Sequence, residues 1–159
     1  MDTNDTNWTV RVERVAGPAS DTGKTYERRV YARNHSFSVG KQASFEPTDA
    51  QPSAVEVLLG ALGADVVAGF EAEAARRRVL IDGLEMRLSG RLDNVLTHLG
   101  VIGEVGHPGL ASINGTLYVT ADADHEALDA LWRAALERSP LVNTLKRSVE
   151  LSLALRIVD

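Results

Sequence analysis

The sequence predicts an α+β protein with about six strands, a long buried central helix and a second amphipathic helix. Several separate segments alternate apolar and polar residues, which is typical of half-buried strands. The fourteen-residue run from Val57 to Phe70 contains Asp65 as its only ionisable residue and is otherwise built from Val, Leu, Ala, Gly and Phe. Five apolar residues further on recur at the spacing of one helical face: Leu128, Leu131, Trp132, Ala135 and Leu136.

Length and composition narrow the class of protein. At 159 residues with a net charge of −5, we expect one domain over residues 1–159, with 1–7 as a flexible N-terminus. No basic stripe offsets the acidic balance, so we expect no nucleic-acid partner. Met1 to Trp8 contains no apolar stretch, and the run around Asp65 is too short and Gly-rich to span a bilayer. We therefore expect a cytoplasmic protein without a membrane partner.

The N-terminal third reads as strands and turns. Trp8, Val10 and Val12 alternate with polar neighbours and predict a first strand. The elements expected after it are a turn over Ser20 to Gly23, a strand from Tyr26 to Arg33, a short strand from His35 to Val39, and a loop from Gly40 to Ser53.

A central helix is predicted from about Ala54 to Arg77. Ser53 is a favoured N-cap, and Glu56 three residues later completes a capping box. The helix is apolar nearly all round, which favours burial. Its small residues indicate close packing against a second helix, of this or another subunit: Gly60, Ala61, Gly63, Ala64, Ala68 and Gly69.

The C-terminal half alternates strands and helices. We expect a strand over Leu84 to Leu92, a Gly-rich connection from Asp93 to about Ala111, a turn at Asn114 and Gly115, and a strand from Thr116 to Thr120. Asp122 or Asp124 caps the amphipathic helix, and Ser139 with Pro140 begins a short third helix. Alternating apolar residues from Val149 to Ile157 form the last strand.

Residues 56–65, with the sequence EVLLGALGAD, resemble the central-helix motif of the OsmC/Ohr family, for which ELLLxALGAC is typical. Ser139, Pro140 and Leu141, followed by Leu145, resemble the family's CPV…L motif at its second cysteine. Further similarities in the same order are Ala74 and Ala75, Ile81, and the segment from Leu84 to Gly90. The resemblance extends over most of the chain, from about Tyr31 to Val158.

The resemblance implies an intertwined α+β homodimer with two sites at the subunit interface. In the family's best-known members, the central-helix cysteine attacks an organic hydroperoxide and the second cysteine closes a disulfide. Here Asp65 stands at the attacking position and Ser139 at the resolving position. The chain has no cysteine, so it has no thiolate to form the sulfenate or disulfide of that cycle.

Asp65 and Ser139 each have two readings. Asp65 is either a proton-donating or -accepting anchor for a polar ligand, or a buried carboxylate satisfied by an arginine or by backbone donors. Ser139 is favoured as a helix cap, because a nucleophilic serine needs a base and an oxyanion hole.

The candidate ligand-binding set contains three further residues, Glu56, Arg33 and His35, in addition to Asp65 and Ser139. Glu56 matches the family's helix-start glutamate, but capping is its favoured role. Relatives send an arginine from the second strand into the site, and either Arg29 or Arg33 matches it. No histidine pair has the spacing of a metal site on a predicted helix, and we expect no metal or other cofactor.

These observations favour a homodimer that has lost cysteine chemistry and binds a small, partly apolar molecule in an interface pocket, with Asp65 as polar anchor. One alternative is an enzyme that uses Asp65 as general acid or base, together with His35. Another is a stress-related structural or partner-binding protein whose pocket is closed.

Overall fold

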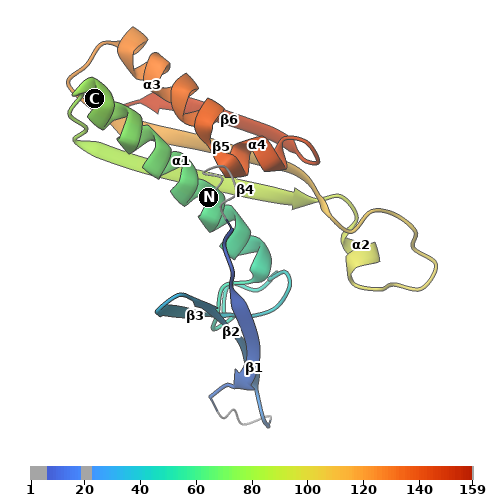
Figure 1. Cartoon of the computed structure of the whole chain (residues 1–159). Helices are drawn as coiled ribbons and strands as arrows, with labels where there is room; N and C mark the ends of the chain where they lie inside the picture. Colours follow the sequence, from blue (N-terminus) through green and yellow to red (C-terminus); the bar gives the residue numbers. More distant parts are fainter. Residues whose placement is uncertain (1–6, 19–22, 159) are drawn as a thin grey trace. The chain divides into compact units, whose positions relative to one another are not determined.

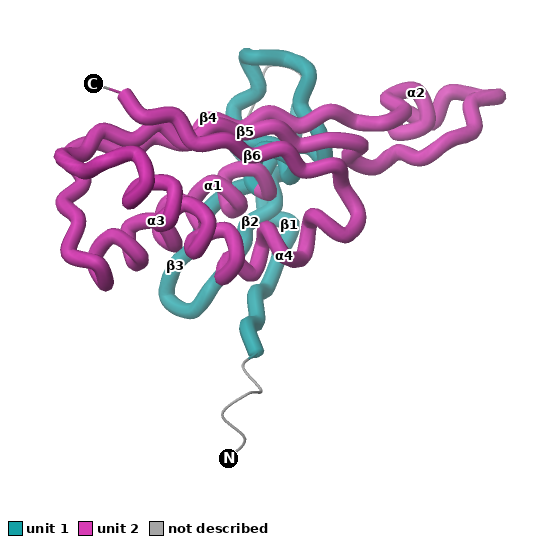
Figure 2. The backbone as a smooth tube through the Cα atoms, turned by 90° about the horizontal axis from the view of Figure 1, so that it is seen from above, with its two compact units in different colours: residues 1–57 teal, residues 58–159 magenta. Residues whose placement is uncertain are grey.

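The structure, a computed structural model, describes residues 7–18 and 23–158. The chain forms two compact units, Met1–Val57 and Leu58–Asp159, called unit 1 and unit 2 below (Figure 2). The boundary falls within the long helix α1, Ala54–Arg77. The predicted flexible N-terminus and the predicted turn over Ser20 to Gly23 lie almost wholly outside the described residues.

Unit 1 is built on a three-stranded antiparallel sheet in the order β1-β2-β3 (Figure 1). The strands are β1, Arg11–Ala16, β2, Tyr26–Ala32, and β3, His35–Val39. Ala32 pairs with His35, so only Arg33 and Asn34 form the turn between β2 and β3. The second and third strands match their predicted bounds to within one residue.

Helix α1 begins and ends where the sequence predicts. The backbone N–H and the hydroxyl of Ser53 each donate to Oε2 of Glu56 at 2.7 Å, and the Glu56 N–H donates to Oγ of Ser53 at 3.3 Å. This is the predicted capping box. At the other end Arg78 has a φ of 58°, and the Val79 N–H donates to the Ala74 carbonyl at 2.9 Å, which closes the helix with a left-handed cap.

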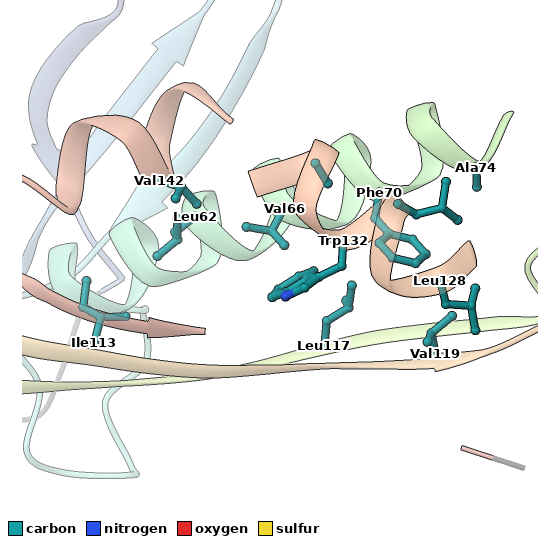
Figure 3. Close-up of a cluster of buried hydrophobic side chains, with 12 residues drawn as sticks. Leu62, Val66, Phe70, Ala74, Ile113, Leu117, Val119, Leu128, Trp132 and Val142 are labelled. Atoms are coloured by element: carbon teal, nitrogen blue, oxygen red, sulfur yellow. The ribbon is translucent and has the colours of Figure 1, made fainter. Parts of the chain in front are cut away.

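Unit 2 is a second three-stranded sheet covered by helices on one face (Figures 1 and 3). Strand β4, Gly83–Leu92, is antiparallel to β5, Leu110–Thr120, whereas β6, Glu150–Ile157, is parallel to β5. The parallel connection runs through α3, His125–Arg138, and α4, Pro140–Leu145. A single-turn helix, α2, Val95–His98, interrupts the connection between β4 and β5.

The core of unit 2 lies between the helices and the sheet. Figure 3 shows side chains of α1 and α3 pointing at those of β5. Burying a large apolar side chain completely contributes about 1.5–3 kcal/mol, so this layer holds the unit together. Its fully buried members include Leu62, Val66, Phe70, Ile113, Leu117, Val119, Leu128 and Leu131.

Within the single chain, α1 is buried on one face only. Ala61, Ala64 and Ala68 are exposed, although the apolar composition predicts burial all round. A Cβ placed on Gly69 would lie 3.7 Å from the carbonyl oxygen of Ala135, so the small residue does allow α1 to approach α3 closely. No helix in the described part of the chain is both long and apolar enough to cross a bilayer.

The predicted turn at Asn114 and Gly115 is wrong, because both residues lie inside β5. A Cβ on Gly115 would lie 2.5 Å from Cδ2 of Leu88 and 2.9 Å from Cδ2 of Leu153. Glycine is found here because side chains of both neighbouring strands fold over its backbone. Strand β5 consequently begins at Leu110, six residues before the predicted start at Thr116.

Candidate functional site

Asp65 and Ser139, which the sequence resemblance places at the positions of two cysteines, are in direct contact. Asp65 lies half-buried on α1, and Ser139 is the N-cap of α4 with only 3% of its surface exposed. The hydroxyl of Ser139 donates to Oδ2 of Asp65, and the Leu141 N–H donates to the same oxygen at 3.1 Å. The sequence-based expectation that a buried aspartate needs donors is therefore met by one hydroxyl and one backbone amide.

Ser139 has both of its hydrogen-bonding capacities in use. Its hydroxyl hydrogen points to Asp65, and its oxygen accepts from the Val142 N–H at 3.0 Å. Among the described residues, no histidine or lysine hydrogen-bonds to Ser139. This geometry indicates that Ser139 caps the helix and orients Asp65. It does not favour Ser139 as a nucleophile, because a nucleophilic serine requires a base.

A hollow of about 90 Å³ adjoins this pair. The part of its lining that comes from α1 follows one helical stripe, since each of these residues lies three or four positions from another member of the stripe. Residues of α3 and Ser139 close the other side. The lining consists of Asp65, Gly69, Ala72, Glu73, Arg76, Ala135, Arg138 and Ser139.

Glu73 is the charged centre of this hollow, and sequence reasoning missed it. Only 4% of its surface is exposed, and its Oε1 accepts hydrogen bonds from Nη1 of both Arg76 and Arg138. The three consecutive arginines 76–78 have the composition of a solvated helix end, which hides the pairing of Arg76 with Glu73. The available signal was the spacing, because Glu73 lies two turns after Asp65 and three residues before Arg76.

The remaining predicted residues belong to unit 1. Glu56 caps α1, and the hydrogen bonds from the backbone and side chain of Ser53 lower the pKa of its carboxyl. Arg29 pairs with Glu27 at 2.6 Å, and this hydrogen bond, followed by one with Ser38, lowers the pKa of Glu27. Arg33 occupies the β2–β3 turn with a φ of 55°, and His35 begins β3.

Within residues 7–18 and 23–158, no group of three or more His, Asp or Glu side chains is arranged to hold a metal ion. The charged cluster at the hollow combines two carboxylates with two guanidinium groups, and guanidinium groups do not ligate metals.

The described chain contains a three-stranded sheet, a long central helix and a second sheet covered by helices. A polar pair links the central helix to a short C-terminal helix. These features define an α+β protein with a candidate site on its central helix. The sequence profile of the family described as OsmC-like protein matches residues 47–154. The chain therefore belongs to the OsmC-like protein family, as the motifs predict. Among curated proteins, none gives a significant sequence match.

Solved structures of low sequence identity share the fold. An OsmC-like protein from Mycoplasma pneumoniae superposes with a TM-score of 0.75 at 15% identity, covering 98% of this chain and 99% of its own. An OsmC-like protein of unknown function from Vibrio cholerae gives 0.69 at 14% identity, covering 97% and 100%. The organic hydroperoxide resistance protein OhrB of Bacillus subtilis gives 0.57 at 19% identity, covering 94% and 98%.

Proposed function

We propose that this OsmC-like protein binds a small, partly apolar molecule, with Asp65 as the polar anchor, in a pocket completed by a second copy of the chain. The observation that carries the proposal is the state of Asp65. Its Oδ2 accepts two hydrogen bonds, whereas its Oδ1 accepts none from the described residues. A carboxylate held by one oxygen beside a hollow is free to bind a donor with the other.

The chemistry of the site is that of binding. Without cysteine, the chain has no sulfur atom that a peroxide oxygen can oxidise and then return through a disulfide. Asp65 can accept or donate a proton, and Ser139 keeps its carboxylate in one orientation. The site thus retains the position of the family's reactive residue with a group suited to recognition.

The size of the hollow supports a second copy as part of the pocket. A volume of about 90 Å³ corresponds to roughly three water molecules, and a drug-sized ligand needs several times more. The exposed face of α1, with Ala61, Ala64 and Ala68, is a surface of small residues on which another chain can pack closely.

Unit 1 offers a second surface for a partner. Its sheet has an apolar hollow of about 650 Å³, lined by Val12, Arg28, Val30, Val39, Gly40, Lys41, Gln42, Ala54 and Val57. We include Glu56, Arg33 and His35 in the proposed site as residues that a homodimer supplies, and we propose the cytoplasm as its location.

Native mass spectrometry of the protein isolated from its own host tests the proposal. We expect a mass of two chains together with a small molecule that is released on denaturation. Asp65→Ala should lose the small molecule, whereas Asp122→Ala, a change at an exposed aspartate, should retain it. If the wild-type protein is a dimer or monomer without a small molecule, the proposal of a bound ligand is overturned. If it is a monomer that carries the ligand, the proposal that a second copy completes the pocket is overturned.

A further inference from the structure

The hollow beside Asp65 contains a second polar end, made of two arginines and one buried glutamate. Arg76 on α1 and Arg138 at the end of α3 both bind Oε1 of Glu73. The two guanidinium groups are thereby held together on one acceptor from two different helices. Glu73 itself has 5% of its side chain exposed, so it is the fixed point of the cluster.

Most of the hydrogen-bonding capacity of the two arginines is free. A guanidinium group has five N–H donors in a planar fork. Each arginine uses Nη1 on Glu73, and neither makes another hydrogen bond within the described part of the chain. Their side chains are 58% and 63% exposed, so the remaining donors are accessible from solvent.

The charges of the cluster do not cancel. One carboxylate at Glu73 faces two guanidinium groups, which leaves one positive charge beside the hollow. Asp65 lines the same hollow with a negative charge. A singly charged carboxylate matches the single positive charge of the Glu73–Arg76–Arg138 cluster, whereas a phosphate dianion would exceed it. Asp65 precedes Glu73 by eight residues on α1, so its carboxylate lies about two helical turns away from that charge.

We propose that the hollow binds the carboxylate group of a monoanionic small molecule through the free donors of Arg76 and Arg138. Glu73 acts as a positioning residue that holds the two forks together. The volume of about 90 Å³ accommodates the acid group and leaves an apolar remainder outside the hollow. This inference rests on the proposed function and names the chemical class of its ligand, a carboxylic acid with an apolar tail.

Calorimetric titration of the purified full-length protein with sodium octanoate, 1-octanol and sodium acetate tests the inference. We expect the affinity for octanoate to exceed that for octanol by about tenfold or more. Arg76→Gln and Arg138→Gln should each weaken octanoate binding by about tenfold and leave octanol binding unchanged. Each variant leaves Glu73 paired with the other arginine, so both should fold, which thermal unfolding checks.

Two neighbouring arginines serve as matched controls. Arg77→Gln changes the next residue of α1, and Arg133→Gln changes an exposed arginine of α3 that donates to the Asp129 carbonyl at 3.3 Å. Neither should alter octanoate binding. Loss of binding in these variants as large as in Arg76→Gln would overturn the site, because a general loss of positive charge would then explain the effect.

The three probes separate failure of the inference from failure of the proposed function. Octanol binding as tight as octanoate, with no dependence on Arg76 or Arg138, overturns the carboxylate site and leaves the proposed apolar ligand standing. Acetate binding as tight as octanoate, with dependence on both arginines, supports the carboxylate site and overturns the apolar ligand. Absence of binding by all three overturns both.

Discussion

The hydroxyl of Ser139 donates a hydrogen bond to the carboxylate of Asp65 across seventy-four residues of sequence. By resemblance to the OsmC/Ohr family, these residues stand where a reactive and a resolving cysteine would stand. The contact joins α1 to the N-terminus of α4 without a covalent bond. Unlike a disulfide, it does not depend on the redox state of the surroundings.

Removing the Ser139 hydroxyl should destabilise the protein and abolish the energetic coupling between residues 139 and 65. We expect Ser139→Ala to lower the free energy of unfolding by about 1.5–3 kcal/mol, since it removes both a helix cap and a charged hydrogen bond. In urea unfolding, a double-mutant cycle with Asp65→Asn should give a coupling energy of about 1 kcal/mol. Asp124→Ala is the control, because it removes a cap whose hydrogen-bond donor, the Ala127 N–H, is only three residues away. Coupling of Asp124 to Asp65 as large as that of Ser139 would contradict the prediction.

Restoring both cysteines should restore the chemistry that the wild type lacks. We expect the wild-type protein to show no thiol-dependent turnover of an organic hydroperoxide. In the variant with Asp65→Cys and Ser139→Cys, the first thiolate takes an oxygen from the peroxide and releases an alcohol. The resulting sulfenic acid then condenses with the second thiol to a disulfide and water.

Consumption of tert-butyl hydroperoxide in the presence of a dithiol reductant measures this activity, and the mass of the oxidised variant should fall by about two hydrogens as the disulfide forms. Ser139→Cys alone has no thiol at the position of Asp65 and should remain inactive. Measurable turnover by the wild type would refute the assignment of a binding role.

The parts of the fold that the sequence predicts well are those set by neighbours along the chain. The capping box of Ser53 and Glu56 spans three residues, so its pattern is readable locally, and α1 begins where it indicates. The same holds for Ser139 and Pro140 at the start of α4. Their contact with Asp65 is not local, and only the resemblance to the family suggested that the two positions belong together.

Contacts between neighbouring strands and between two helices could not be predicted from local sequence patterns. Asn114 and Gly115 have the composition of a turn, yet Leu88 of the neighbouring strand determines that glycine is needed inside β5. Arg138 reaches Glu73 across sixty-five residues, and nothing near Glu73 in the sequence indicates that a second arginine joins it. Such contacts depend on packing between α1 and α3, which local patterns do not specify.

Glycine 115 should be the position in β5 most sensitive to an added methyl group. Gly115→Ala places Cβ against Leu88, Leu153 and Met86 at once, so we expect a loss of about 1–3 kcal/mol in urea unfolding. Gly83→Ala, in β4, meets only Thr120 at 3.6 Å and should change the free energy of unfolding little. Equal effects of the two substitutions would show that packing over Gly115 is not the cause.

The capping carboxylate of Glu56 should make stability depend on acid pH. Hydrogen bonds from Ser53 lower its pKa from the usual 4.5 in the folded state. A lowered pKa stabilises the folded state above the unfolded value, and this contribution is lost as pH falls through the folded pKa. Glu56→Gln keeps an acceptor for Ser53 but does not titrate, so its stability should fall less steeply below about pH 4.5.

Urea unfolding at pH 7, 5, 4 and 3 measures this slope. Part of the slope should remain in Glu56→Gln, because Lys41 and then Ser44 lower the pKa of Asp49, and Arg29 lowers that of Glu27. Glu71→Gln is a suitable control, since Glu71 is exposed inside α1, away from its dipole ends, and its side chain makes no hydrogen bond among the described residues. The wild-type slope should persist in that variant, and an unchanged slope in Glu56→Gln would contradict the role of the capping box.

At Arg78, the residue after α1, glycine should be preferred over alanine. Its φ of 58° is left-handed, which costs a residue with a Cβ about 1–2 kcal/mol, and glycine about nothing. Arg78 also lies at the negative end of the α1 dipole, so its removal loses a favourable charge. Comparing Arg78→Gly with Arg78→Ala cancels that loss, because both variants lack the charge. We expect the glycine variant to be more stable by about 1 kcal/mol in thermal or urea unfolding. At Arg77, inside the helix, the order should reverse, and the same preference for glycine at both positions would contradict the left-handed cap.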